Sequence, residues 1–326
     1  MHDRCTAILI VYFFSIEMRI LALVPGGIGD QIYFFPTLET LSSKYTHAII
    51  DVLVEPRAKG AYRVCKYVDE VLQFDYRDRS SMADYLNLLG VIRDREYDIA
   101  ISYNAPWAVE SLLWLNGIPM RIGEQKKNSW AFSQTIPLKK EQYKPQTYHG
   151  ILQGLGIQVD CPPVKINVPQ KDIDWAEQRQ QFLEIKDGYI LLHGVLENYP
   201  LDSWQKIVTD IQDKQPEIPL VLLQTQEEDR WITAMLGSNS SLRVVAPSDI
   251  GKIAAIIAGA NLLLSSDRDS LALAIATGTY TMALLDSEDT IEQLLPQDDN
   301  YIGIASSSDR IADISPETVL SKVWGS

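Results

Sequence analysis

The chain has 326 residues, of which 46% are hydrophobic and 22% are charged. This length and composition indicate a globular protein of about two domains, and they exclude a low-complexity or disordered chain. The formal net charge of −14 would repel a phosphate backbone, so we expect no binding of nucleic acid. A small anion can still be held at a helix N-terminus, which acts through local geometry.

The N-terminal 17 residues precede the first clear strand. Residues 5–16 form an apolar run that is too short to span a bilayer, which takes about 20 residues, and no small-residue cleavage site follows. Met18 stands just before the next apolar strand. We expect residues 1–17 to be an upstream extension and Met18 the natural start. A short membrane anchor and an extra edge strand are the alternatives.

From residue 19 onward, short apolar strands alternate with helices. In the first half the expected strands are residues 19–24, 48–54, 70–74, 98–102 and 119–123, and the expected helices are 31–45, 61–68, 82–95 and 107–115. A proline-containing stretch at 162–171 marks a domain boundary. In the second half the expected strands are 189–193, 220–223, 242–245, 261–265 and 281–285, and the expected helices are 173–183, 203–211, 227–236, 250–258, 270–276 and 316–324.

This alternation predicts two α/β domains, each with a doubly wound parallel sheet covered by helices on both faces. We place the first domain at residues 18–165 and the second at 172–326. Ligands of open α/β sheets bind outside the carboxyl ends of the strands, so we expect a cleft between the two domains. We also expect the last helix to pack back on the N-terminal domain.

The first candidate site is the loop between the first strand and the first helix. It contains Gly26, Gly27, Gly29 and Asp30. Glycines allow close backbone approach, and the helix N-terminus offers unpaired N–H groups. The loop lacks the Gly-Lys-Ser/Thr of a P-loop and the full dinucleotide-binding spacing. The alternative is a plain turn in which Asp30 caps the helix.

Ordered matches over residues 18–123 resemble one enzyme family, the heptosyltransferase-like glycosyltransferases of family nine. The matching segments are Gly27-Ile28-Gly29-Asp30, then Pro36, Leu38 and Leu41, then residues 50–54 (IDVLV), 68–71 (VDEV), 74–75 (FD), 97–101 (YDIAI) and 119–123 (PMRIG). The second half matches more loosely, through Tyr199-Pro200 with Trp204, Glu227-Glu228 and Ser266-Asp267.

The resemblance implies a GT-B fold, in which two Rossmann-like domains face each other across a cleft. It implies transfer of a heptose-like sugar from a nucleotide-diphosphate sugar, often ADP-heptose, to a hydroxyl of a lipopolysaccharide or other glycan or glycolipid acceptor in bacteria. No metal and no cofactor are implied. The N-terminal domain would bind the acceptor, and Asp30 would be the base that deprotonates its hydroxyl.

The nucleotide-sugar is expected on the C-terminal domain. The residues that we expect to contact it are His193, Glu228, Asp267, Arg268 and Ser270. Arg268 would be the cation for phosphate, or else a solvated residue paired with a neighbouring aspartate. His193 would face the ligand or be a satisfied, half-buried histidine. Glu228 would accept from the ribose hydroxyls, or simply favour the first turn of a helix.

Two departures from the family pattern affect the diphosphate side. Where the family commonly has a Lys, the segment 193–200 reads HGVLENYP and places Glu197. After Asp267 the family typically continues with a Gly and then a His, but this chain has Asp269 and Ala272. Carboxylates next to a diphosphate are repulsive, so leaving-group stabilisation is weakened.

Two functions therefore stay open. The first is a working glycosyltransferase, located in the cytoplasm or at the inner face of the cytoplasmic membrane if its acceptor is a lipid. The second is a catalytically degenerate relative that binds or assembles with a protein partner. The intact loop at Gly29 and Asp30 favours the first, whereas Glu197, Asp269 and Ala272 favour the second.

Overall fold

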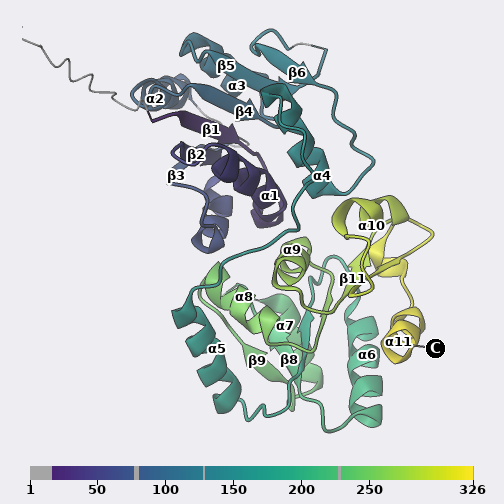
Figure 1. The fold of residues 1–326 in the computed structure, drawn as a ribbon. Coiled ribbons are helices and arrows are strands. Elements are labelled where there is room, and N and C mark those ends of the chain that lie inside the picture. The colour runs from purple at the N-terminus through teal and green to yellow at the C-terminus, as the bar shows by residue number, and fades with distance from the viewer. Residues whose placement is uncertain (1–16, 77–80, 128, 227–228, 326) are drawn as a thin grey trace, which may run out of the picture.

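The computed structural model describes residues 17–76, 81–127, 129–226 and 229–325. Figure 1 shows two α/β halves, one above the other, joined by a segment without helices or strands at residues 156–169. The expectations for residues 1–16 and for the side chain of Glu228 lie outside the described residues. No helix in the described part of the chain is long and apolar enough to cross a membrane.

The first half contains a parallel six-stranded sheet in the order β3-β2-β1-β4-β5-β6. Its strands are β1 (Arg19–Leu23), β2 (Ile49–Val54), β3 (Glu70–Gln73), β4 (Ile99–Ser102), β5 (Met120–Glu124) and β6 (Gln134–Ile136). β1, β2 and β4 are almost wholly buried, as expected of strands covered on both faces. The order reverses between β1 and β4, and this reversal is the position at which such sheets bind ligands.

The second half repeats this topology, with its strands in the order β12-β11-β10-β7-β8-β9 and all neighbours parallel. Its strands are β7 (Ile190–His193), β8 (Leu220–Leu223), β9 (Arg243–Val245), β10 (Leu262–Ser265), β11 (Thr281–Leu285) and β12 (Tyr301–Ala305). Here the order reverses between β7 and β10. The predicted fold class, two doubly wound parallel sheets, is confirmed.

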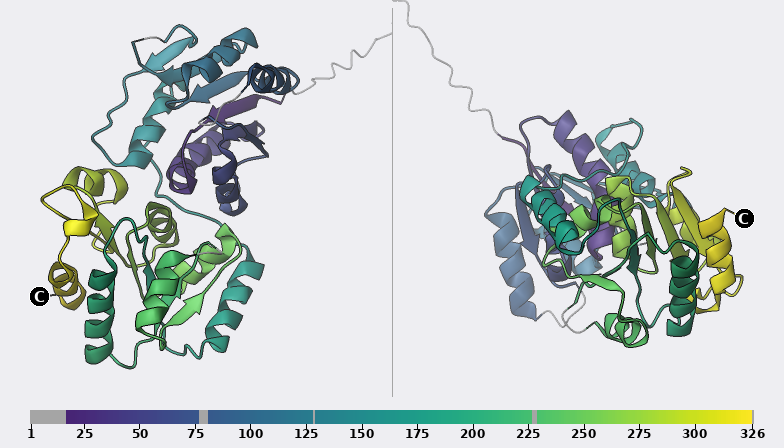
Figure 2. Two further views of the ribbon diagram at one scale, coloured as in Figure 1. Left: turned by 180° about the vertical axis from the view of Figure 1, so that it is seen from behind. Right: turned by 90° about the horizontal axis from the view of Figure 1, so that it is seen from below.

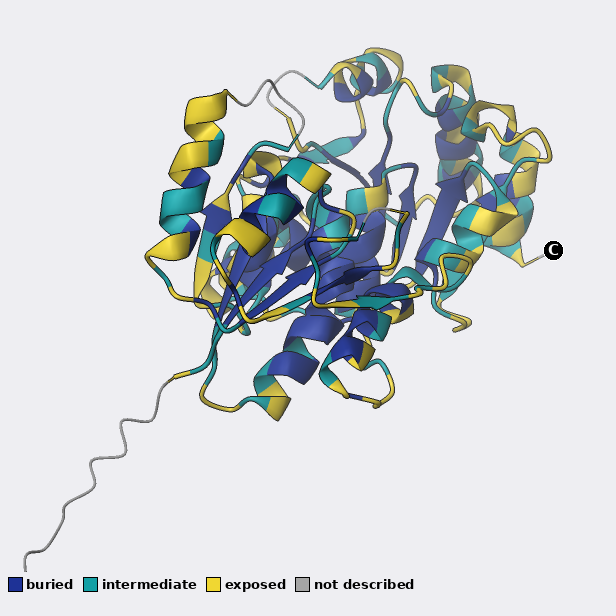
Figure 3. Cartoon of the chain, turned by 90° about the horizontal axis from the view of Figure 1, so that it is seen from above, coloured by how far each residue is buried: buried dark blue, intermediate teal, exposed yellow. Residues whose placement is uncertain are grey.

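Helices cover both sheets, and Figure 3 shows the dark-blue strands between helices whose outer faces are exposed. In the first half these are α1 (Ile28–Lys44), η1 (Pro56–Val64), α2 (Met82–Arg93), α3 (Trp107–Leu115), α4 (Lys144–His149) and η2 (Gly150–Leu155). In the second half they are α5 (Gln170–Phe182), α6 (Leu201–Lys214), α7 (Arg230–Ser238), α8 (Ile250–Ala258), α9 (Arg268–Thr277), α10 (Glu288–Leu294), η3 (Ile311–Asp313) and α11 (Pro316–Trp324).

The two halves pack directly against each other. α1 of the first half contacts α9 of the second, and η1 contacts α8. One apolar cluster of buried residues runs through both halves and includes Ile32, Leu38, Leu271 and Ala272. Within this cluster, the Tyr33 hydroxyl donates to the carbonyl of Leu294 at 3.1 Å. The contact therefore holds the loops at the carboxyl ends of the two sheets face to face.

Several elements differ from the sequence expectations. The helix expected at 61–68 is a 3₁₀ segment that starts earlier, at Pro56. β6, β12, α4, η2 and α10 were not expected, because they are short and lack a clear apolar period. The expected return of the last helix to the N-terminal domain is wrong. α11 packs on α6 in the second half (Figure 2), where the Trp324 indole donates to Asp210.

Candidate functional site

The predicted loop and the predicted second-half residues meet between the two halves. Gly27 is the N-cap of α1, in the loop that follows β1, and Asp267 is the N-cap of α9, in the short turn that follows β10. A cavity of about 510 Å³ lies there. Its lining includes Ile28, Arg57, Arg63, His193, Thr225, Asp249, Asp267, Asp269 and Ser270. The cavity thus lies at the switch point of the second sheet, where ligands of such folds bind, and against the segments that follow β1 and β2 of the first sheet.

Asp30 is held by three donors from the first half. Its Oδ2 accepts from the backbone N–H of Gly27 at 2.9 Å, and its Oδ1 lies 2.5 Å from the Lys144 amine and accepts from the Tyr148 hydroxyl at 3.0 Å. The Asp30 side chain is 25% exposed. The carboxylate is thus charge-balanced and part-exposed, which suits a base for a hydroxyl. Asp30 is not itself among the residues that line the cavity, although Ile28, two positions before it, is.

Gly26 is required by this arrangement. Its φ of +129° is a conformation that residues with a side chain rarely adopt. A Cβ atom at Gly26 would also lie 2.1 Å from Oδ2 of Asp30. The first glycine of the loop therefore makes room for the carboxylate of the residue four positions later.

Asp269 joins the two halves at this loop. Its Oδ1 accepts from the backbone N–H of Gly29 at 2.7 Å, although the two residues are 240 positions apart. A Cβ at Gly29 would lie 3.0 Å from this oxygen and 3.5 Å from the Cβ of Ala272, so the close approach needs a small residue on each side. Burial, and then the neighbouring Asp267 carboxylate, raise the pKa of Asp269.

His193 ends β7 and is 4% exposed. Its Nδ1 lies 2.5 Å from the Ser270 hydroxyl, and its Nε2 lies 3.5 Å from the hydroxyl of Thr225. Burial lowers the pKa of His193 against the opposing effect of Asp267, so the imidazole is neutral at pH 7. Asp267 caps α9 by accepting from the Ser270 N–H at 2.8 Å. The structure therefore brings His193, Asp267 and Ser270 together around one cavity.

Arg268 does not lie with them. Its guanidinium pairs with Asp286 at 2.8 Å, and the two side chains are 58% and 37% exposed. It is not among the residues that line the cavity. Arg268 is therefore a solvated residue paired with an aspartate, which was the alternative interpretation from the sequence. Its partner is Asp286, and not Asp267 or Asp269.

The arginines that do line the cavity come from η1 and were missed. Arg57 pairs with Glu55 at 2.7 Å, and Arg63 lies 2.8 Å from Asp172 and 2.9 Å from Asp249. They were missed because the sequence around them contains no phosphate-binding motif and because they lie in the first half, whereas we expected the nucleotide-sugar on the second. Lys144 was also missed, because it reaches Asp30 from α4, 114 positions away in the same half. The Pro that follows it is a signal for a helix start.

A smaller cavity of about 150 Å³ continues past His193 and Asp267 along residues 194–197. Glu197, which stands where a Lys was expected, lies 3.4 Å from Arg230, and both side chains are more than two-thirds exposed. This cavity lies on the second half alone and is open to solvent next to α7. Among the described residues, no group of three or more His, Cys, Asp or Glu side chains is arranged to hold a metal ion.

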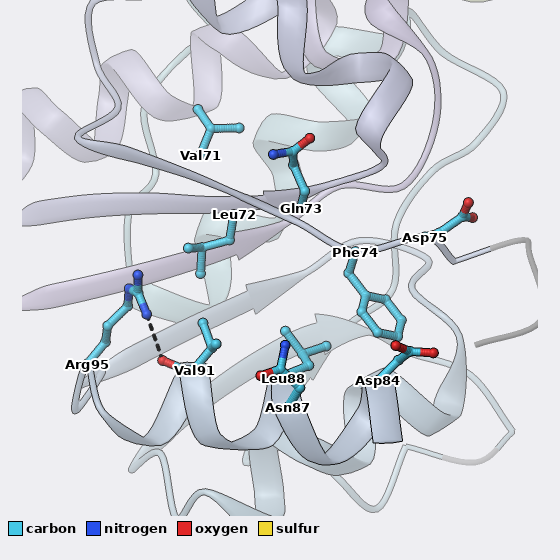
Figure 4. A pocket seen from close by; sticks show the side chains of 10 residues that line it. All are labelled: Val71, Leu72, Gln73, Phe74, Asp75, Asp84, Asn87, Leu88, Val91 and Arg95. Atoms are coloured by element: carbon cyan, nitrogen blue, oxygen red, sulfur yellow. Dashed lines mark hydrogen bonds between the residues drawn. The ribbon is translucent and has the colours of Figure 1, made fainter. Parts of the chain in front are cut away.

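A separate cavity of about 650 Å³ lies at the outer edge of the first sheet, between β3 and α2 (Figure 4). Its charged lining residues are Asp75, Asp84 and Arg95. Arg95 is held by Glu70 at 2.8 Å and by the carbonyl of Val91 at 2.9 Å, and Asp84 belongs to the cap of α2. Arg95 and Asp84 serve local structure, so this cavity is a weaker candidate than the one between the halves.

Residues 86–321 match the family pattern described as glycosyltransferase family 9 (heptosyltransferase). The chain belongs to this family. The match covers the later part of the first half, from within α2 onward, and nearly all of the second half, where the motifs were looser.

Solved structures of family 9 proteins have the same fold. The family 9 glycosyltransferase from Veillonella parvula has a TM-score of 0.80 at 16% identity, with 94% of this chain and 96% of that chain covered. Escherichia coli heptosyltransferase WaaC with ADP-2-deoxy-2-fluoro heptose has a TM-score of 0.71 at 13% identity, with coverages of 94% and 99%. At these identities the likeness establishes the fold alone.

A curated relative outside bacteria is also similar. The photosynthetic NDH subunit of subcomplex B 1, chloroplastic, from Arabidopsis thaliana is 21% identical over 337 residues, which cover 92% of this chain and 72% of that protein. This family 9 chain is thus similar both to heptosyltransferases and to a protein named as a subunit of a larger complex.

Proposed function

We propose that this family 9 protein transfers a sugar from a nucleotide-diphosphate sugar to a hydroxyl of a glycan or glycolipid acceptor. The observation that supports it is the position of Asp30: a charge-balanced, part-exposed carboxylate at the head of α1, two residues after Ile28, which lines the cavity between the halves. The similar fold of WaaC was solved with ADP-2-deoxy-2-fluoro heptose, which makes an ADP-sugar the first donor to test.

In the proposed reaction the acceptor hydroxyl gives its proton to Asp30 as its oxygen forms a bond to the anomeric carbon. The bond between that carbon and the diphosphate oxygen breaks, and the nucleoside diphosphate leaves with the electron pair. Lys144 and Tyr148 hold the Asp30 carboxylate in place before this step. Arg57 and Arg63 are the arginines that line the cavity, and each would have to divide its charge between the leaving group and its present carboxylate partner.

We further propose that the protein acts in the cytoplasm, or at the inner membrane face if the acceptor is a lipid. The acidic net charge of −14 gives no attraction to an anionic leaflet. Contact with such a membrane would therefore depend on the acceptor itself or on apolar residues.

The experiment that tests the proposal is a calorimetry and thermal-shift panel of ADP, GDP, UDP and CDP with their sugar conjugates. A ligand at 100 times its dissociation constant should stabilise the fold by about 2.7 kcal/mol. The expected result is stabilisation by one nucleotide family, followed by sugar transfer that needs Asp30. Stabilisation by none of them would reject the transferase.

A second candidate is a degenerate family member that serves as a binding or assembly module. It is favoured by the carboxylate of Asp269 where the family typically has glycine, by Glu197 in place of a Lys, and by the pairing of Arg268 with Asp286. The relative named as a complex subunit gives it further weight. This candidate predicts that no nucleotide binds and that Asp30→Asn leaves the cellular role intact.

A further inference from the structure

The carboxylate of Asp269 is seated on the N-terminus of a helix in the other half of the protein. Its Oδ1 accepts from the N–H of Gly29, in the first turn of α1, at 2.7 Å. This helix end is where a bound anion would be held, because the dipole and the unpaired N–H groups of the first turn favour negative charge. Asp269 thus takes the position of an anionic ligand.

The surroundings of Asp269 do little else to stabilise its charge. Within the described residues it forms no ion pair, whereas Asp30 beside it has Lys144. The carboxylates of Asp267 and Asp30 repel Asp269, and the attraction of Arg57 is weaker than either repulsion. The bond to the α1 terminus is therefore its main stabilising contact.

The fit between the two halves accommodates this contact. A Cβ at Gly27 would lie 3.5 Å from Oδ1 of Asp269, and one at Gly29 would lie 3.0 Å from it. The first of these distances is an ordinary contact and the second is tight, so the glycine at position 29 is the one that lets α9 approach the loop closely. Asp269 also lines the 510 Å³ cavity with Arg57 and His193, so an anionic group bound in this cavity beside α1 lies next to the carboxylate.

We propose that Asp269 is a positioning residue that holds the Gly27–Asp30 loop of the first half against the second half, and that it acts as a built-in competitor for anionic ligands at the N-terminus of α1. A diphosphate gains this position only by displacing the Asp269 carboxylate. The holding role stands by itself, whereas the competition with a nucleotide-sugar rests on the proposed function.

The test compares the full-length protein with Asp269→Ala and Asp269→Asn. Alanine removes both the charge and the hydrogen bond, while asparagine removes the charge and keeps an acceptor oxygen for Gly29. Asp289→Asn is the matched control, since Asp289 is an exposed first-turn aspartate of α10 in the same half. The probes are pyrophosphate and ADP by calorimetry, and hydrogen exchange of peptides that contain residues 27–31.

The expected result is faster exchange of residues 27–31 in Asp269→Ala only, together with pyrophosphate and ADP binding that is about tenfold tighter in both Asp269 variants, because a like charge is gone. Unchanged exchange in Asp269→Ala would overturn the holding role. Equal or weaker binding in both variants would overturn the competition.

The outcome also separates this inference from the proposed function. If the native chain binds ADP and the variants bind it no better, the competition fails while the transferase proposal stands. If only the variants bind ADP, the competition is supported and the native chain fails as a nucleotide-dependent transferase.

Discussion

The amine of Lys144 lies 2.5 Å from Oδ1 of Asp30, and this ion pair joins residues 114 positions apart. Lys144 begins α4, a helix of six residues that packs on α1. The pair balances the charge of the proposed base and sets the direction in which its carboxylate points. The chemistry that we propose for the site depends on this arrangement.

Replacing the proposed base should abolish transfer without unfolding the protein. In Asp30→Asn the amide oxygen can still accept from the Gly27 N–H, but the residue can no longer take a proton. We expect turnover to fall by about 10²–10⁴-fold, measured with the donor that the binding panel identifies, while donor affinity and melting temperature change little. Full turnover in this variant would show that Asp30 is not the base.

Removing the partner of Asp30 should have a smaller effect. In Lys144→Met, Asp30 keeps the hydrogen bonds from the Gly27 N–H and the Tyr148 hydroxyl but loses the charged hydrogen bond from the Lys144 amine. We expect turnover to fall about tenfold, as for the loss of one charged hydrogen bond worth ~1.5 kcal/mol. Lys206→Met is the control, because Lys206 pairs with Glu317 in an exposed position of the second half. Equal effects of the two substitutions would mean that Lys144 has no special role.

The loop glycine should matter to both fold and activity. In Gly26→Ala the methyl group meets the Asp30 carboxylate and the backbone must leave a φ of +129°. We expect a loss of ~1–3 kcal/mol in unfolding free energy, together with a loss of turnover. The control is Gly117→Ala, where φ is +69° and the added Cβ meets nothing within 4 Å. Gly117→Ala should lose stability but keep its turnover. Chemical denaturation measures the stability of both variants, and a turnover assay measures their activity.

Arg268 should be dispensable for nucleotide binding. Its exposed pair with Asp286 should contribute ~0.5 kcal/mol or less, and it does not line the cavity. We expect Arg268→Ala to leave both the nucleotide affinity and the melting temperature nearly unchanged. A drop in affinity measured by calorimetry would show instead that Arg268 leaves Asp286 and contacts phosphate in the bound state.

Stability should decrease in mild acid through His193. Burial lowers the pKa of His193 in the folded protein, so the unfolded chain takes up a proton first, below its ordinary pKa of about 6.5. The stability contributed by the neutral imidazole is thus present above a pH of about 6.5 and is lost as the pH falls through the folded value. In urea denaturation, His193→Gln should lose less stability than the native chain when the pH is lowered through this range. Equal losses would contradict a buried neutral His193.

Local sequence patterns were enough to predict the architecture and the loops that surround the cavity. The alternation of apolar strands with helices predicted two doubly wound sheets, because strands buried on both faces read as continuous apolar runs. The loop at Gly26–Asp30 and His193 were predicted from their positions at the ends of strands, because the carboxyl ends of parallel strands share one edge. Asp267 and Ser270 were predicted from the resemblance to family nine. The sequence alone therefore predicted which residues lie near the carboxyl end of a strand, and hence near the cavity.

Which side chains meet could be learned only from the tertiary structure, within each half and between the two. The pairing of Lys144 with Asp30, the contact of Asp269 with Gly29 and the arrival of Arg57 and Arg63 at the cavity join residues from separate elements or separate domains. Arg268 turned to Asp286, and α11 packed on α6, because each found a partner within its own half. The contacts within a half depend on how its elements pack together in space. The contacts between the halves depend on the packing of α1 on α9, and no local sequence pattern predicts that packing.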